Sequence, residues 1–301
     1  MRITPSTRVL VTGASGSLGW AVARLLAARS EVTSAYFTHS RVLEGTAAVR
    51  LDLADAPSIE SLFEGSKVDV VIHSAALTDP DACERDPRAA LKVNFEATQR
   101  LASLARFAGS YFVFISTDLV FDGAKGNYAE EDKPCPLSIY GMSKLRAEEA
   151  VLGADPRNVV LRSALIYGLG GSASRTFLGR MLEVLAGGSQ VRLFTDQRRC
   201  PVLVDDLAQS IVLAIEEGLA GVYHVGGADA VSRYEFGQQV CRVFGYGEDL
   251  LLPTRMAEFE ALARRPLDAT LDSRKFRRAT GFVPCGLAEG LARTKRTRSL
   301  Y

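Results

Sequence analysis

Apolar runs bounded by turn residues alternate with segments of helical periodicity through the first half of the chain. The apolar runs predict strands over residues 8–11, 32–37, 48–51, 68–73, 111–116 and 159–162. The helical pattern predicts helices over residues 18–28, 58–63, 89–107 and 140–151. The runs VDVVIH and YFVFIS are apolar almost throughout, which is typical of parallel strands that are buried on both faces. The alternation therefore predicts an α/β fold with a doubly wound parallel sheet.

The second half of the chain is less regular and predicts a smaller C-terminal α/β lobe. We expect a helix over residues 176–185 and another that Asp205 caps and that ends near residue 216. Ser232 and Glu235 form an S-x-x-E capping box for a helix that ends near residue 244, and Asp272 would cap a helix ending at residue 281. The predicted division is a large domain over residues 1–165 and a smaller lobe over residues 166–301, from which the chain returns in part to the large domain.

Composition and charge exclude several classes of protein. The net charge is +1, from 36 basic and 35 acidic residues, so the balance of charge gives no reason to expect nucleic acid as a partner. The five cysteines and three histidines are scattered, which argues against a disulfide framework and against a metal site. The segment MRITPSTRVLVTG has no basic start before an apolar core, and no apolar run could span a bilayer. We therefore expect a cytoplasmic protein without a membrane segment.

A glycine turn follows the first predicted strand, in RVLVTGASGSLG. Gly13 would permit a tight turn, Gly16 would let the backbone approach a pyrophosphate, and Gly19 would let the helix pack against the sheet. The helix that follows offers unpaired N–H groups and a partial positive charge to phosphates. The segment predicts a Rossmann dinucleotide site, and the 1–165 domain would bind NAD(P).

The second predicted strand bears on which dinucleotide is bound. It ends in AYFTHSR and lacks the acidic residue that holds the ribose 2′-hydroxyl in NAD enzymes. Thr38, Ser40 and Arg41 instead supply hydroxyls and a positive charge, which suit a 2′-phosphate. Asp52 ends the third strand, where its carboxylate would accept a hydrogen bond from the adenine amino group. We predict that NADP is preferred and that NAD remains possible.

Tyr140 and Lys144, in YGMSK, lie four residues apart and share one face of a helix. A free tyrosine has a pKa of about 10 and is a poor acid–base catalyst near neutral pH. A nearby ammonium and an oxidised nicotinamide both favour the phenolate, which would let Tyr140 exchange a proton with a substrate oxygen. Ser116 and Thr117 leave the end of a buried strand, where a hydroxyl would hydrogen-bond the same carbonyl. The set predicts a site for carbonyl reduction.

Taken together, TGASGSLG, LDLAD, HSAALTD, ISTDLVFDG and YGMSK resemble the extended short-chain dehydrogenase/reductase family. Within it, the segments FDGAKGNYAEEDKPCPLSIYGMSKLRAEE, TDQRRCPVLVDDLA and ARRPLDATLDSRKF are similar to the dTDP-4-dehydrorhamnose reductase group. The resemblance implies that Thr117, Tyr140 and Lys144 are catalytic and that Tyr140 and Lys144 also contact the cofactor. It further implies a cofactor site made by Gly13, Ser15, Gly16, Ser17, Leu18, Gly19, Asp52, Leu53, Ala75, Ala76 and Asn94.

The resemblance also implies a substrate site at Thr78, Asp118 and Leu119, and Leu119 departs from the group's pattern. The rhamnose-pathway reductases have a tyrosine at this position, and the sugar-nucleotide dehydratases have a glutamate. A leucine can neither abstract a proton nor hydrogen-bond a sugar. The departure speaks against a dehydratase and predicts a substrate other than dTDP-4-dehydrorhamnose.

Three functions remain open from the sequence. The first is a reductase that acts on a keto group of a nucleotide-linked deoxysugar, in which Arg198 and Arg199 would reach the nucleotide phosphates. The second is a non-catalytic NADP-binding subunit similar to the beta subunit of methionine adenosyltransferase, because fold does not fix function. The third is a nucleotide-sugar epimerase, which would recycle tightly bound NAD. A homodimer is possible in each case.

Overall fold

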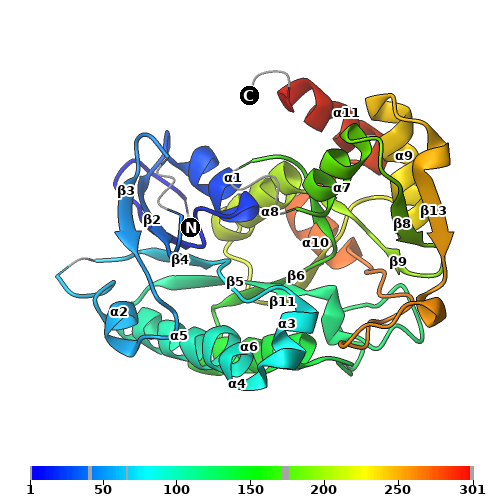
Figure 1. The fold of residues 1–301 in the computed structure, drawn as a ribbon. Coiled ribbons are helices and arrows are strands. Elements are labelled where there is room, and N and C mark those ends of the chain that lie inside the picture. The colour runs from blue at the N-terminus through cyan, green and yellow to red at the C-terminus, as the bar shows by residue number, and fades with distance from the viewer. Residues whose placement is uncertain (1, 40–42, 66, 171–175, 299–301) are drawn as a thin grey trace.

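The computed structural model describes residues 2–39, 43–65, 67–170 and 176–298 of the chain. At its centre is a seven-stranded sheet with the spatial order β11-β6-β5-β4-β1-β2-β3, in which every pairing is parallel (Figure 1). The strands are β1 (Arg8–Thr12), β2 (Glu31–Tyr36), β3 (Ala47–Arg50), β4 (Val70–His73), β5 (Tyr111–Thr117), β6 (Val159–Ser163) and β11 (Gly221–Val225). The strand order reverses between β1 and β4. The predicted doubly wound α/β fold is confirmed.

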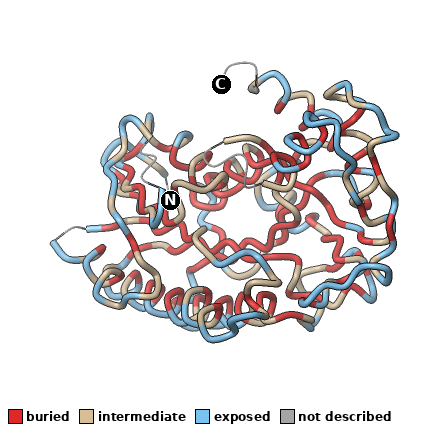
Figure 2. The backbone as a smooth tube through the Cα atoms, viewed as in Figure 1, coloured by how far each residue is buried: buried red, intermediate tan, exposed pale blue. Residues whose placement is uncertain are grey.

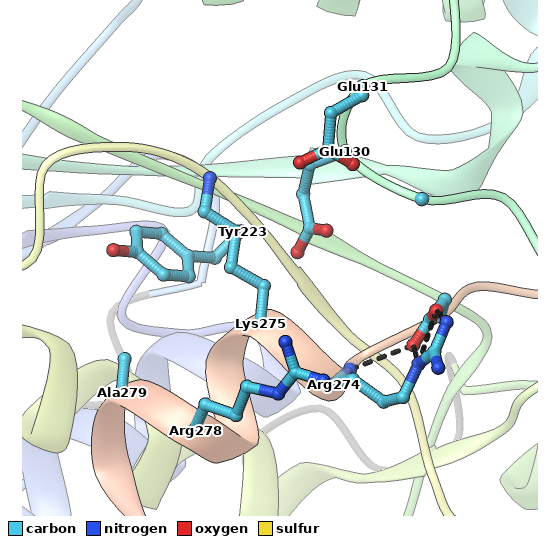
Figure 3. A pocket seen from close by; sticks show the side chains of 9 residues that line it. Glu130, Glu131, Tyr223, Arg274, Lys275, Arg278 and Ala279 are labelled. Atoms are coloured by element: carbon cyan, nitrogen blue, oxygen red, sulfur yellow. Dashed lines mark hydrogen bonds and ion pairs between the residues drawn. The ribbon is translucent and has the colours of Figure 1, made fainter.

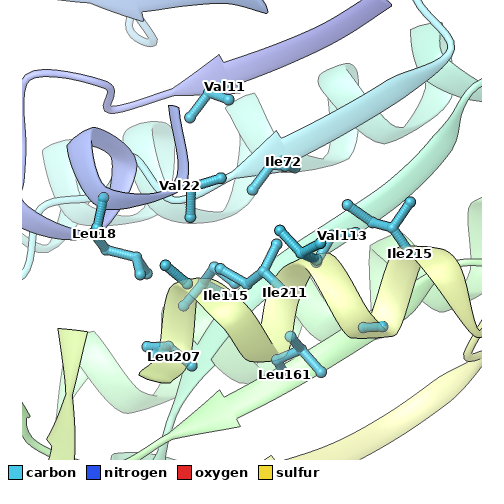
Figure 4. Close-up of a cluster of buried hydrophobic side chains, with 14 of the residues drawn as sticks. Val11, Leu18, Val22, Ile72, Val113, Ile115, Leu161, Leu207, Ile211 and Ile215 are labelled. Carbon is cyan, nitrogen blue, oxygen red and sulfur yellow. The ribbon is translucent and has the colours of Figure 1, made fainter. Parts of the chain in front are cut away.

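Alternate residues of each central strand enter two different apolar layers, because a strand has a period of two residues. Val9 and Val11 of β1 pack with helices α1 (Ser17–Leu26) and α8 (Val204–Glu216) on one face (Figure 4). Leu10 packs on the other face, which is covered by α2 (Ala56–Glu60), α5 (Ala97–Ala108) and α6 (Ile139–Ala154). Buried backbone therefore runs through the middle of the molecule (Figure 2), and burial of the central strands on both faces is confirmed.

The smaller lobe has its own apolar core, which includes Leu182, Phe236 and Leu291. Helices α7 (Phe177–Ala186), α9 (Arg233–Phe244) and α11 (Leu287–Arg298) surround the parallel pair β8 (Val191–Phe194) and β13 (Leu251–Thr254). Two further pairs of two-residue strands are β7 (Ile166–Tyr167) with β10 (Val202–Leu203), and β9 (Arg198–Arg199) with β12 (Val231–Ser232). The short helical segments are α3 (Pro80–Arg85), α4 (Pro87–Leu91), η1 (Lys92–Glu96), η2 (Asp118–Val120), η4 (Glu248–Leu250), η5 (Met256–Glu258) and α10 (Arg274–Thr280).

The chain returns to the large sheet after residue 165, through α8 and the edge strand β11. The sequence pattern did not predict β11, because GVYHV has too short an apolar run to resemble the central strands. The Ser232–Glu235 capping box is confirmed at the start of α9. The two predicted aspartate caps are wrong. Leu203 occupies the cap position of α8, and Asp205 lies two residues later, in the first turn of the helix. Its carboxylate forms an ion pair with Arg24 at 2.7 Å.

The second of these caps, Asp272, precedes the cap position of α10. Ser273 occupies that position without a side-chain bond to the helix. The carboxylate of Asp272 accepts a hydrogen bond from the backbone N–H of Arg274 at 2.9 Å and forms an ion pair with its guanidinium. The helix ends at Gly281, as predicted, with this glycine in the left-handed conformation.

Candidate active site

The glycine turn lies where the strand order reverses, between the carboxyl ends of β1 and β4. Gly13 has φ +71°, and a Cβ there would lie 3.0 Å from the backbone of Ala75, which follows β4. A Cβ on Gly19 would lie 2.3 Å from the carbonyl oxygen of Gly13, so the helix needs glycine to pack this close. The turn is closed by the N–H of Gly16, which donates to the carbonyl of Gly13 at 2.9 Å.

Helix α1 begins at Ser17 with no side-chain cap and no acidic residue in its first turn. Its first N–H groups therefore have neither a side-chain partner nor a competing negative charge nearby, which is the arrangement that binds phosphates. Ser15 and Ser17 are half-buried beside this end, whereas Leu18 points into the apolar core, so only its backbone faces the turn.

The end of β4 is fixed by hydrogen bonds to β1. The hydroxyl of Ser74 donates to the carbonyl of Thr12 at 2.7 Å, and the N–H of Ala75 donates to the hydroxyl of Thr12 at 3.3 Å. His73 bonds Thr12 through Nδ1 at 2.7 Å and Thr98 through Nε2 at 2.9 Å. Burial, with a contribution from the Lys144 charge, lowers the pKa of His73 to about 3. The histidine is thus a neutral group that holds the cleft wall.

Asn94 lies in a π-helical turn, η1, which interrupts the single helix predicted over residues 89–107. Its side-chain amide donates to the carbonyl of Leu77 at 3.0 Å and to the hydroxyl of Ser143 at 3.1 Å, and its carbonyl accepts from the N–H of Leu77 at 2.8 Å. Asn94 therefore joins the loop after β4 to α6. π-helical turns are frequent at functional sites, and periodicity alone does not reveal them.

The residues proposed for the adenosine end of the cofactor are only partly described. Thr38 is exposed, and its hydroxyl bonds His39 at 2.8 Å. Asp52 and Leu53 follow β3 and are half-buried, and the carboxylate of Asp52 accepts from the N–H of Ala54 at 2.8 Å. Ser40 and Arg41 lie outside the described residues, so their roles stay predictions.

Thr117 and Tyr140 come together at the carboxyl end of β5. The hydroxyl of Thr117 accepts the N–H of Leu119 at 3.1 Å, which caps η2, and donates to the carboxylate of Asp118 at 3.1 Å. The same hydroxyl is close enough to the phenol of Tyr140 to favour its phenolate form. Tyr140 is the second residue of α6. A Cβ on Gly141 would lie 2.2 Å from the carbonyl of Leu119, so the glycine lets the start of α6 sit against this turn. Burial, the Asp118 charge and, to a lesser extent, the nearby Cys83 raise the pKa of Tyr140 above its usual range, and the Thr117 hydroxyl opposes this rise.

Lys144 is buried one turn further along α6, with its Nζ 3.9 Å from the centroid of the Phe114 ring. His73 stacks on the same ring, with the two ring centroids 5.8 Å apart. Burial lowers the pKa of Lys144 to about 7, and the negative charge of Glu148 opposes this shift.

Glu148 belongs to a buried network that the sequence analysis missed. It forms an ion pair with Arg162 of β6 at 2.7 Å, and both side chains are almost fully buried. The hydroxyl of Ser116 donates to the same carboxylate, so Ser116 points towards α6 and not towards a ligand. The spacing of Tyr140, Lys144 and Glu148 at intervals of four places all three on one helical face and was the signal available.

The substrate candidates have different environments. Thr78 is exposed after β4, and Leu119 packs near Tyr140 in a small apolar cluster. Arg198 is exposed, donates to the carbonyl of Ala230 at 2.8 Å, and lies 3.8 Å from Glu235.

The structure contradicts the expectation that Arg199 reaches the nucleotide phosphates. Its guanidinium is buried against Asp118, with Nε 3.1 Å from Oδ2. Its two other nitrogens donate to the carbonyls of Pro266, Leu267 and Arg198. Burial raises the pKa of Asp118, and the charges of Arg199 and Arg233 oppose that rise. All three nitrogens of the Arg199 guanidinium thus contact groups within the protein, and Asp118 is held by an ion pair to the small lobe.

A separate pocket of about 520 Å³ lies at the edge strand β11 and helix α10, away from these residues (Figure 3). Both acidic and basic side chains line it, among them Glu130, Asp272, Arg274 and Lys275. Within the described ranges, no group of three or more metal-ligating side chains is found, and no helix is long and apolar enough to cross a membrane.

Comparison with known proteins decides the family. The model of the RmlD substrate binding domain family matches residues 7–298. The chain belongs to this family. The expected resemblance to dTDP-4-dehydrorhamnose reductases and the extended short-chain fold is confirmed.

Relatives within this similarity carry different names. A probable low-salt glycan biosynthesis reductase, Agl14 of Haloferax volcanii, is 34% identical over 265 residues, which cover 87% of this chain and 88% of that protein. A dTDP-4-dehydrorhamnose reductase of Mycobacterium tuberculosis is 31% identical, over 93% of this chain and 89% of its own length. The methionine adenosyltransferase 2 subunit beta of Danio rerio is 30% identical, over 89% and 84%.

Among solved structures, the dTDP-4-dehydrorhamnose reductase of Bacillus anthracis in complex with NADP has a TM-score of 0.87 and 26% identity. The match covers 97% of this chain and 99% of that one.

Proposed function

We propose that this protein is an NADP(H)-dependent reductase of a keto group on a nucleotide-linked deoxysugar. The observation that carries the proposal is the meeting of Thr117 and Tyr140 at the end of β5, with Lys144 one helical turn away, in a member of the RmlD family. Relatives named as reductases of such substrates support it, among them a probable dTDP-4,6-dihydroxy-2-methyloxan-3-one 4-ketoreductase of Streptomyces antibioticus, 34% identical over 280 residues.

The cleft at the strand reversal fits a dinucleotide. The left-handed turn at Gly13 and the uncapped start of α1 leave backbone N–H groups for a pyrophosphate, and a side chain at Gly13 would strike Ala75. Gly13, Gly16 and the N–H groups of Ser17 and Leu18 would hold the phosphates, and Lys144 the nicotinamide ribose. When bound, the reduced nicotinamide supplies a hydride to the carbonyl carbon. The solved relative in complex with NADP supports NADP as the preferred dinucleotide.

Tyr140 would supply the proton that balances the hydride. Because burial raises its pKa, Tyr140 holds its phenolic proton at neutral pH, which is the form that a proton donor needs for reduction. The proton passes from Oη to the carbonyl oxygen, and the product is a hydroxyl. The Thr117 hydroxyl beside the phenol and the Lys144 ammonium would both lower the free energy of the phenolate left behind.

The test is oxidation of NADPH by the purified protein with a panel of dTDP-4-keto sugars, combined with fluorescence titration of NADPH and NADH. We expect turnover of at least one sugar and tighter binding of NADPH than of NADH. Binding of neither dinucleotide would overturn the proposal, and preference for NADH would overturn the choice of NADP.

A non-catalytic role is the second candidate, because the Danio rerio relative is a subunit of methionine adenosyltransferase. It predicts tight NADP binding without turnover of any keto sugar in the panel. A cytoplasmic location and a homodimer stay predictions.

A further inference from the structure

Arg233, the first residue of α9, has a buried Nη1 atom without a hydrogen-bond partner among the described residues. Its Nε donates to the side-chain oxygen of Gln197 at 2.9 Å, and its guanidinium lies 4.6 Å from the centroid of the Phe177 ring. The antiparallel pairing of β12 with β9 places Arg233 beside Gln197, whose backbone carbonyl accepts the N–H of Arg233 at 3.2 Å. The backbone N–H and Nε of Arg233 thus have acceptors, whereas the buried Nη1 has none.

The neighbouring arginines all have acidic partners. Arg199 pairs with Asp118 at 3.1 Å, Arg265 pairs with Asp81 at 2.7 Å, and Arg198 lies 3.8 Å from Glu235 and 3.9 Å from Asp268. For Arg233, the described part of the chain offers no carboxylate within ion-pair distance, only the neutral amide of Gln197 and an aromatic ring. The guanidinium of Arg233 is therefore the cation of this cluster without a counter-charge in contact.

Three features make this position unfavourable for the fold alone. A buried donor without a partner destabilises the folded state. A positive charge at the first position of a helix faces the positive end of the helix dipole. Burial, assisted by the Arg199 charge, lowers the pKa of Arg233 to about 9. Natural proteins keep such local conflicts mainly where a ligand or a reaction compensates for them.

The location relates Arg233 to the candidate active site. Its charge acts on Asp118, the residue next to Thr117, from the small-lobe side. Asp118 also has a buried oxygen, Oδ2, without a hydrogen bond, although Arg199 lies 3.1 Å away. Arg233 is thus linked to the turn that carries Thr117 through β9: it contacts Gln197, and Arg199 of the same segment contacts Asp118.

We propose that Arg233 binds a phosphate oxygen of the nucleoside diphosphate part of the substrate. This inference rests on the proposed function and replaces the expectation for Arg199. A phosphate supplies both things that Arg233 lacks: an acceptor for Nη1 and a negative charge in contact with the guanidinium. A sugar hydroxyl would supply the acceptor alone. The planar guanidinium suits phosphate, and its contact with Phe177 and Gln197 holds it in one orientation before binding.

The experiment measures the affinity of dTDP and UDP, by calorimetry, for protein saturated with NADP. The variant is Arg233→Met, which keeps an unbranched apolar stem and removes the guanidinium with its charge. The matched control is Arg242→Met on the same helix, where the arginine is exposed and paired with Glu248. We expect the Kd of the better-bound diphosphate to rise by about tenfold or more in Arg233→Met only, since charge-assisted hydrogen bonds are the strong ones. The affinity for NADPH should stay unchanged in both variants.

A second readout separates ligand binding from a structural role. Without ligand, Arg233→Met should melt at the same temperature as the wild type or higher, because an unpaired buried cation is removed. A lower melting temperature with unchanged diphosphate affinity would show that Arg233 only fastens α9 to Phe177, and the proposal would fall. Binding of neither dTDP nor UDP to the wild type would overturn it as well.

If Arg233→Met does not fold, the diphosphate affinity of Arg233→Lys tests the proposal instead. Lysine keeps the charge but loses the planar pair of donors, so diphosphate affinity should fall several-fold while NADPH affinity is kept. Unchanged diphosphate affinity in Arg233→Lys would overturn the proposal. Turnover of keto sugars tests the proposed function separately: an inactive protein whose diphosphate affinity depends on Arg233 would retain this inference and lose only the reductase proposal.

Discussion

Arg162 of the large sheet and Arg233 of the small lobe differ in what their guanidinium groups contact. Arg162, in the large sheet, pairs with Glu148 through two nitrogens, and Ser116 completes the carboxylate. Arg233, in the small lobe, has a neutral partner and a buried nitrogen with none that the structure describes. A satisfied buried ion pair stays fixed whether or not a ligand is bound. A cation without a carboxylate partner is instead stabilised by a ligand that brings a negative charge and an acceptor to it. We therefore infer that the charge of Arg162 stabilises the fold, whereas the charge of Arg233 is available to bind a ligand.

The largest expected effect comes from breaking the satisfied network. Glu148→Gln should destabilise the fold by about 3–5 kcal/mol, because Arg162 would remain buried without its counter-charge. The measurement is urea unfolding at neutral pH. Glu149→Gln, at the exposed neighbouring position, is the control and should leave the unfolding free energy within about 0.5 kcal/mol of the wild type. Equal stability of both variants would show that the network does not hold α6 to the sheet.

The next effect concerns the pH dependence of stability through Lys144. Its pKa is about 7 in the folded chain and about 10.4 in an unfolded one, so between these values the unfolded chain binds the extra proton. Stability from this group therefore rises with pH in that window and is lowest below pH 7. The wild-type unfolding free energy should rise more steeply from pH 7.5 to 9.5 than that of Lys144→Met, by up to about 1 kcal/mol per pH unit. Parallel curves would contradict the burial of the ammonium.

The smallest effect tests the position where this chain departs from its relatives. Leu119 is half-buried near Tyr140 and offers no hydrogen bond to a sugar hydroxyl. A hydroxyl left unpaired costs about 1–3 kcal/mol, so the wild type should turn over dTDP-4-dehydrorhamnose poorly. Leu119→Tyr should raise kcat/KM for that sugar by roughly tenfold, whereas Leu119→Phe, which adds the ring without the hydroxyl, should not. Efficient turnover by the wild type would show that Leu119 does not select the substrate.

The sequence predicts the fold and the part of the site on the large sheet, because both depend on local residue patterns. The apolar strands, the glycines of the turn and the Tyr140–Lys144 spacing each carry their own signal. The partners of Arg199 and Arg233 carry none, since β9, β12 and residues 266–267 meet only through tertiary pairing. The sequence shows an arginine but not which carboxylate it pairs with in the fold. The prediction that Arg199 binds phosphate is wrong because Asp118 is its partner.

Two further misses have the same origin. The π-helical turn at Asn94 preserves an apolar periodicity that predicts one continuous helix. The aspartate caps failed because Asp205 and Asp272 each find an arginine partner in the folded chain. Tertiary contacts override the local pattern at Asn94 and Asp205, whereas Asp272 pairs with Arg274 two residues along the chain.

The central claim is that Tyr140 donates the proton in a carbonyl reduction, and Tyr140→Phe tests it most directly. The substitution removes the phenolic oxygen and keeps the buried ring. With a keto sugar that the wild type reduces, and with NADPH saturating, turnover should fall by about a hundredfold or more. The affinity for NADPH should stay within about threefold, because the glycine turn and α1 are untouched. Tyr140→Phe protein that reduces the sugar at the wild-type rate would contradict the account.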